Sequence, residues 1–143
     1  MILNVSYNNK EVIQKINSEL GNPFPLMERI KMGGIGSPRL NMVGMSIQIH
    51  NLMVLDNNRN VCNIEMRPKG IIIGFRSLLE SYALIIPFYK LTLYKGNANE
   101  YSLYRDDYFV KIEAKSKDKG IHRFMKKIME AKTNFLAPRI EDL

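Results

Sequence analysis

The residues with the clearest chemical potential in this sequence are seven cations gathered near its end. They lie between residues 115 and 132, where two carboxylates oppose them, so seven cations against two acids give this segment +5 of the chain's net charge of +7. A basic balance of this kind favours acidic partners: nucleic acid, an anionic membrane surface or an acidic protein. The candidate partner-binding residues are Lys115, Lys117, Lys119, Arg123, Lys126, Lys127 and Lys132.

The other residues that could do chemistry lack the spacing that catalysis or metal binding requires. Neither His50 nor His122 has a cysteine or carboxylate at a metal-ligand spacing, and we expect His122 to be solvated. Asp106 and Asp107 are adjacent, which suits a hairpin turn better than acid–base work. Cys62 alternates with apolar neighbours and is expected in the core. We therefore predict a protein that is not an enzyme, with no catalytic residue, metal or cofactor.

Length and composition set the broad class. The chain has 143 residues, 45% apolar and 24% charged, which fits one globular domain with a real core. Its longest apolar run, residues 82–88, is too short to span a bilayer. The first five residues lack the basic and apolar regions of a secretory signal. A single cysteine suits a reducing compartment, so we expect a cytoplasmic protein.

We interpret the first 42 residues as an extension of the main domain. Residues 10–20 predict a short helix, because Val12, Ile16 and Leu20 fall on one stripe and Asn9 can cap its start. A glycine-rich stretch follows at residues 31–38. It lacks the spacing of a phosphate-binding loop, and we interpret it as a connector.

From residue 45 onward the apolar period changes to two, which is typical of half-buried strands. The runs are separated by short turn-like segments, which favours an antiparallel meander. Pro87 cannot donate to a strand ladder and marks a corner. The predicted strands are residues 45–55, 62–67, 71–76, 82–86, 88–95, 100–105 and 108–114.

The chain then predicts one long amphipathic helix. Asp118 can cap its start, and Pro138 ends it. Spacings of three and four residues place its apolar side chains on one stripe, opposite the lysines. The stripe comprises Ile121, Phe124, Met125, Ile128, Met129, Phe135 and Leu136.

Seven antiparallel strands followed by one amphipathic helix resemble the pleckstrin-homology-like (PH-like) superfold, including its bacterial branches. The resemblance covers about residues 43–137 and rests on element order, the corner at Pro87 and the terminal helix. It implies a mainly β (α+β) fold, a seven-stranded antiparallel barrel or sandwich capped by the C-terminal amphipathic helix, with a short N-terminal helix. The expected division is 1–42 for the helical extension and glycine-rich loop, 43–137 for the barrel with its helix, and 138–143 for a tail.

The same resemblance suggests a secondary site in three loops. In phosphoinositide-binding members of the superfold, the loops after strands one, three and six form a basic pocket. A multiply charged phosphate head group requires several converging cations, but the loops here have three cations against four acids and lack the family's lysine-then-basic-x-arginine spacing. We therefore expect no phosphoinositide or membrane binding. The cations are Arg59, Arg76 and Arg105, and the acids are Asp56, Glu80, Asp106 and Asp107.

Three functions remain open at this point. We favour a binding or adaptor module, or a subunit of a protein or ribonucleoprotein complex, that docks acidic partners through the basic helix. A second possibility is direct RNA or DNA binding by that helix together with Lys111, Lys115 and Lys117. Six tyrosines lie between residues 82 and 108, and although aromatic strand faces can stack bases, we interpret these as strand-packing residues. A third is a small-ligand carrier or enzyme with a helix-grip fold, which would require an internal cavity.

Overall fold

Strand alternation builds the sheet as the sequence indicates. In β3 (Val61–Arg67), Cys62, Ile64 and Met66 are buried, and the residues between them are more exposed. The computed structural model describes residues 1–54, 60–96 and 99–137. Within these ranges the other strands are β1 (Ile2–Asn4), β2 (Leu40–Met45), β4 (Gly70–Ser77), β5 (Glu80–Pro87), β6 (Thr92–Lys95), β7 (Glu100–Arg105) and β8 (Tyr108–Glu113).

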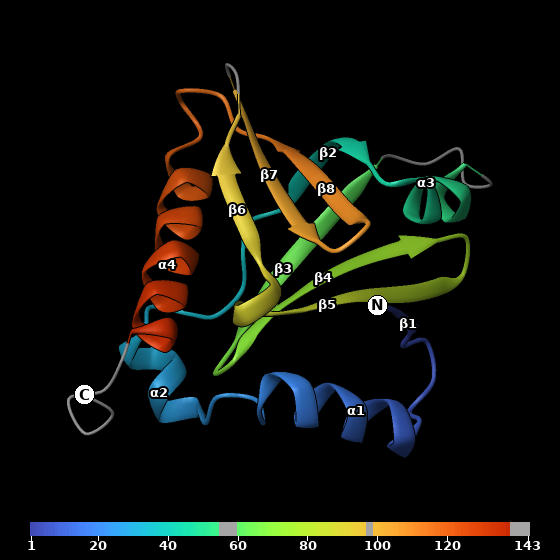
Figure 1. The fold of residues 1–143 in the computed structure, drawn as a ribbon, viewed down its shortest axis with the longest axis horizontal. Coiled ribbons are helices and arrows are strands. Elements are labelled where there is room, and N and C mark those ends of the chain that lie inside the picture. The colour runs from blue at the N-terminus through green and yellow to red at the C-terminus, as the bar shows by residue number, and fades with distance from the viewer. Residues whose placement is uncertain (55–59, 97–98, 138–143) are drawn as a thin grey trace.

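These eight antiparallel strands form one open sheet in the order β1-β5-β4-β3-β2-β8-β7-β6. Two meanders, β3–β5 and β6–β8, meet at β2, which pairs with β3 on one side and β8 on the other. The register of β2 against β8 shifts between Met42 and Gly44, and such a bulge bends a strand. Figure 1 shows the consequence, with β6–β8 running steeply across the direction of β4 and β5.

Four α-helices and one short 3₁₀ turn accompany the sheet in the described part of the chain. Helix α4 stands against the β6–β8 half, with α2 at its foot, and α1 runs below β5 (Figure 1). The helices are α1 (Lys10–Leu20), α2 (Leu26–Lys31), α3 (Ile47–Met53) and α4 (Lys119–Leu136), and the 3₁₀ turn is η1 (Phe88–Lys90). None of the helices in these ranges has the length and apolar character needed to cross a bilayer.

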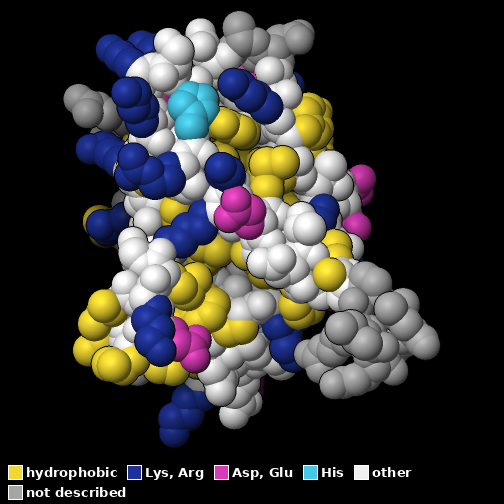
Figure 2. Space-filling view, turned by 90° about the vertical axis from the view of Figure 1, so that its left-hand side faces the viewer, with side chains coloured by type: hydrophobic (Ala, Val, Ile, Leu, Met, Phe, Trp, Pro, Cys, Tyr) yellow, Lys and Arg dark blue, Asp and Glu magenta, His cyan; other side chains and the backbone are white. Residues whose placement is uncertain are grey.

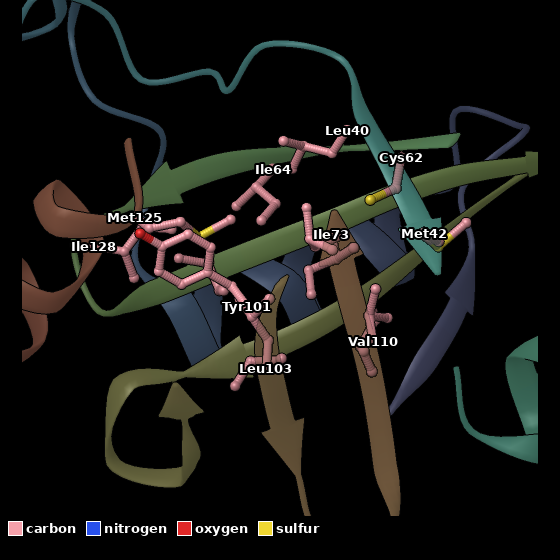
Figure 3. Close-up of a cluster of buried hydrophobic side chains, with 14 of the residues drawn as sticks. Leu40, Met42, Cys62, Ile64, Ile73, Tyr101, Leu103, Val110, Met125 and Ile128 are labelled. Atoms are coloured by element: carbon pink, nitrogen blue, oxygen red, sulfur yellow. The ribbon is translucent and has the colours of Figure 1, made fainter. Parts of the chain in front are cut away.

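The core lies between the inner faces of the two meanders and α4. Phe124, Met125 and Ile128 of α4 are buried in it, and Figure 3 shows Met125 and Ile128 beside the ring of Tyr101. Full burial of such a side chain contributes about 1.5–3 kcal/mol. The apolar stripe of α4 therefore fixes the helix to the sheet, as the sequence predicts. Its last part departs from the prediction, because Met129, Phe135 and Leu136 are exposed.

Residues 1–42 contribute directly to the sheet. β1 pairs with β5, and Ile16 and Leu20 of α1 pack with Ile85 on the face opposite the main core. Helix α1 has its predicted bounds, and the side chain of Asn9 accepts a hydrogen bond from the Glu11 N–H. The expected division between residues 42 and 43 falls inside β2.

The prediction of a strand at residues 45–55 is wrong. β2 ends at Met45, Ser46 occupies the N-cap position in an extended conformation, and α3 follows. Ile49 and Met53 are four residues apart and both buried, so a helical period fits this short segment as well as a period of two. The count of seven strands is also wrong, because β1 adds an eighth to the seven strands β2–β8.

The predicted strand at residues 88–95 is half correct. After Pro87 the chain makes the η1 turn and resumes as β6 only at Thr92. This turn changes the phase of the side chains: Leu91 is buried as expected, while Tyr89, expected on the same face, is exposed. The other predicted strands are confirmed to within a few residues.

Candidate partner-binding surface

Helix α4 presents its polar side as a row of unpaired cations. Lys119, Arg123 and Lys126 follow one another at spacings of four and three residues, which places them on one side of a helix. Lys117 lies in the turn just before it. All four side chains are exposed, and none forms an ion pair with another described residue. Together they form the α4 cationic face, and Figure 2 shows Lys and Arg side chains gathered on this side of the molecule.

The other three predicted cations bind within the protein. Lys115 Nζ lies 3.5 Å from Glu113 Oε1. Lys127 Nζ donates to the carbonyl oxygen of Gly34 at 2.7 Å, and Lys132 Nζ donates to the carbonyl of Leu91. Lys127 and Lys132 are partly buried and hold α4 against the rest of the fold, so they are less available to a partner.

The turn that leads into α4 is held by a partly exposed network of polar groups. His122 Nε2 lies 2.8 Å from the carbonyl oxygen of Lys115, and its Nδ1 lies 2.7 Å from the hydroxyl of Tyr101. A carbonyl can only accept, so we infer that Nε2 carries a proton and donates it to Lys115. Asp118 Oδ2 accepts from the N–H of Lys115 at 2.8 Å. These bonds fix the position of Lys117.

The expectation that His122 is solvated is therefore wrong. Both of its ring nitrogens have partners, and its ring packs against that of Tyr101 at 5.5 Å between centroids. Burial raises the pKa of the Tyr101 hydroxyl. Asp118 is the N-cap residue, as predicted, but its carboxylate binds the preceding turn and not an N–H of the helix.

An apolar patch that the sequence did not reveal lies beside this surface. Leu26, Met27 and Ile30 of α2 are exposed by 70%, 69% and 68%. They form the α2 apolar patch, and hydrophobic side chains gather below the cations in Figure 2. The bond from Lys127 to Gly34 joins α4 to the segment just after α2. Concentrated exposed apolar surface of this kind marks binding sites.

The secondary loop site is not assembled. Arg105 is buried, with 5% exposure, and its guanidinium donates to the carbonyl of Ile85 and to Glu19 Oε2 at 3.2 Å. Arg76 is exposed on β4 and lines a groove that does not include Arg105. Arg59 lies outside the described residues. Arg105 is thus a structural residue, and the prediction that it belongs to a loop site is wrong.

Cys62 is confirmed as a core residue. Burial raises the pKa of its thiol to about 12, so it stays protonated and unreactive at neutral pH. Within residues 1–54, 60–96 and 99–137, no three His, Cys, Asp or Glu side chains gather to hold a metal ion.

Comparisons of this chain with protein-family models, with curated proteins and with solved structures found no match. The PH-like resemblance therefore remains a prediction from the order of elements. The function has to be argued from the surfaces described above.

Proposed function

We propose that this protein is a non-enzymatic binding module, an adaptor or subunit of a protein or ribonucleoprotein complex, that docks an acidic partner on the α4 cationic face. The observation that carries the proposal is the contrast between the two sides of α4. One side is fixed in the core by Phe124, Met125 and Ile128, and the other presents four cations that have no partner among the described residues. Because the backbone of α4 is already ordered by the core, binding has to order only the side chains of these cations.

The α2 apolar patch favours a protein as this partner. A charged phosphodiester backbone does not bind exposed aliphatic side chains favourably. Protein interfaces, in contrast, combine an apolar centre with a polar or charged rim. Leu26, Met27 and Ile30 supply such a centre beside the cations. The partner expected here is an acidic protein segment that also carries apolar side chains.

The architecture proposed for this module is PH-like. Seven antiparallel strands, β2–β8, precede α4, and β2 links the first meander to the last strand. This order supports the resemblance, with the first strand at Leu40–Met45 and β1 as an addition at the edge. Cytoplasmic location is part of the same proposal and follows from the single, reduced cysteine.

Charge reversal on α4 tests the docking proposal. A variant in which Lys117, Lys119, Arg123 and Lys126 are all replaced by Glu should lose partner capture from a nuclease-treated extract of its source cells. The apparent affinity should fall by about tenfold or more, because steering and complementarity reverse together. The matched control reverses four exposed cations on other elements, with the same change in net charge: Lys10, Lys15, Lys69 and Lys95. Equal capture by the two variants would contradict the proposal.

A second variant separates protein from nucleic acid as the partner. Replacing Leu26, Met27 and Ile30 by Ser removes the α2 apolar patch without touching a cation. Capture of a protein partner should weaken, because the apolar centre of the interface is lost. Binding that survives this change but disappears on nuclease treatment would point to nucleic acid instead.

One observation supports nucleic-acid binding as a second candidate function. On β6–β8 the rings of Tyr94 and Tyr104 stack at 5.6 Å and 11°, Phe109 follows at 5.5 Å, and Lys111 Nζ lies 6.0 Å from the Phe109 ring. An aromatic row beside a cation can stack bases of a single strand. In that case the logarithm of the association constant for a single strand should fall linearly with the logarithm of the salt concentration, with a slope of about −0.7 per phosphate contacted. The helix-grip alternative gains no comparable support, because described inward side chains fill the core.

A further inference from the structure

A second feature with chemical character lies on the outer face of the sheet, away from α4. An open groove of about 980 Å³ crosses β3, β4 and β5. Its floor is made of small residues: Gly74 is paired with Ala83 on one side and Asn63 on the other, and Ser81 lies opposite Arg76 in the next pair on this face. The groove is hollow because Gly74 of β4 and Ala83 of β5 place almost no side chain above these two adjacent strands.

Two arginines are among the described residues that line this groove, and no carboxylate is among them. Arg39 and Arg76 are both exposed, and neither forms an ion pair with another described residue. The described lining residues therefore carry a charge of +2. Because none of them supplies a counter-charge, an anion from solution suits these guanidiniums.

The backbone places the two arginines on the same face. Gly36 pairs with Glu65 and Leu40 with Cys62, so five residues oppose four and the chain bulges just before β2. A bulge of this kind re-aims the side chains at it. Ordinary strand spacing then puts the Cα atoms of Arg39 and Arg76 about 12 Å apart, two strands and two residues from each other. Two extended arginine side chains at that separation can meet over one anion.

We propose that this groove binds a small organic phosphomonoester. The phosphate lies between Arg39 and Arg76, since the guanidinium fork matches phosphate oxygens in a bidentate manner. The carbon body lies against apolar residues of the lining, which include Val5, Val61 and Ile72. The volume is that of sites for small molecules. This inference is independent of partner docking on α4.

Titration calorimetry of the full chain with phenyl phosphate tests the proposal. The wild type should show saturable binding, and Arg39→Gln and Arg76→Gln should each weaken it by about tenfold or more, because each removes charge-assisted hydrogen bonds. Gly74→Val should also weaken it by raising the floor. This variant should fold, because the added Cβ meets only the flexible end of Asn63, at 2.7 Å. Lys95→Gln on β6, an exposed cation outside both the groove and the α4 cationic face, is the matched control and should bind as the wild type does.

Two further ligands test the contacts to the phosphate and the contacts to the apolar wall separately. Benzyl alcohol, which has the ring without the charge, should not bind measurably, and inorganic phosphate should bind more weakly than phenyl phosphate. The proposed site would be overturned if the wild type did not bind phenyl phosphate. It would also be overturned if Arg39→Gln and Arg76→Gln bound phenyl phosphate as tightly as the wild type. Inorganic phosphate binding as tightly as phenyl phosphate would overturn the role of the apolar wall. Vesicles of an anionic phospholipid that bind in preference to phenyl phosphate would overturn the assignment to a soluble ligand.

Discussion

Gly70→Ala should destabilise the protein by about 3 kcal/mol or more, a severe case of overpacking. A Cβ at this position would lie 2.3 Å from the carbonyl oxygen of Ile86 and 2.7 Å from Cα of Pro87, and both are backbone atoms. It would also lie 2.7 Å from Leu20 Cδ2. The turn before it cannot move aside, because Lys69 accepts from the Phe88 N–H and donates to the carbonyl of Leu20.

The measurement is urea unfolding followed by circular dichroism, with Gly36→Ala as the matched control. Gly36 lies four residues before β2, but nothing lies within 4 Å of its added Cβ, and its φ is not in the left-handed region. Its replacement should change the free energy of unfolding by no more than about 0.5 kcal/mol. Equal free energies for the two variants would show that β4, β5 and α1 do not pack as described.

Arg105→Met should cost about 3 kcal/mol of stability, the scale for breaking a buried ion pair. Methionine preserves the packing of the side chain, but the carbonyl of Ile85 loses its donor and Glu19 loses its counter-charge. Glu19→Gln should cost less, because the amide oxygen can still accept from the guanidinium and Asp106 Oδ2, 3.8 Å from Arg105 Nε, remains as a counter-charge.

Arg76→Met is the comparison variant for this prediction. Arg76 also lies near the end of a strand, but its side chain is exposed and forms no ion pair or hydrogen bond with another described residue, so its replacement should change the free energy of unfolding by no more than about 0.5 kcal/mol. Urea unfolding of the two variants distinguishes a structural arginine from a free one. Similar losses in both would contradict the assignment of Arg105 to the interior.

The elements that could be predicted from the sequence are those whose spacing of apolar residues fits only one type of secondary structure. The alternation around Ile64 runs the length of a strand, and the stripe through Phe124 and Ile128 runs over several helical turns. The segment at residues 47–53 is too short for its apolar residues to distinguish the period of a strand from that of a helix. Burial of Ile49 and Met53 against the sheet decides in favour of the helix.

Strands β1 and β2 could not be predicted from the sequence for a different reason. β1 has three residues, and its identity as a strand comes from pairing with β5 and not from its own pattern. β2 has the alternation Leu40 and Met42, but it stands next to glycines and a proline that indicate a loop. Pairing partners that lie far along the chain cannot be read from one segment.

The candidate surface was predicted in part. Charge density located α4, but the sequence could not separate Lys126, which is free, from Lys127, which bonds to a distant carbonyl. His122 was misjudged because its partners Tyr101 and Lys115 come from another strand and the preceding turn. A signal for the α2 apolar patch did exist: Leu26, Met27 and Ile30 lie in a segment too short to bury them.

Thiol labelling of the two sides of α4 tests the central claim most directly. Native Cys62 is buried and protonated, so it provides an unreactive background. At pH 8 a cysteine placed by Lys126→Cys should react with a maleimide as fast as a free thiol, and should become protected when the partner is bound. A cysteine placed by Met125→Cys should react only as fast as the protein unfolds. Equal rates for the two variants, or labelling of Lys126→Cys that the partner leaves unchanged, would contradict the account.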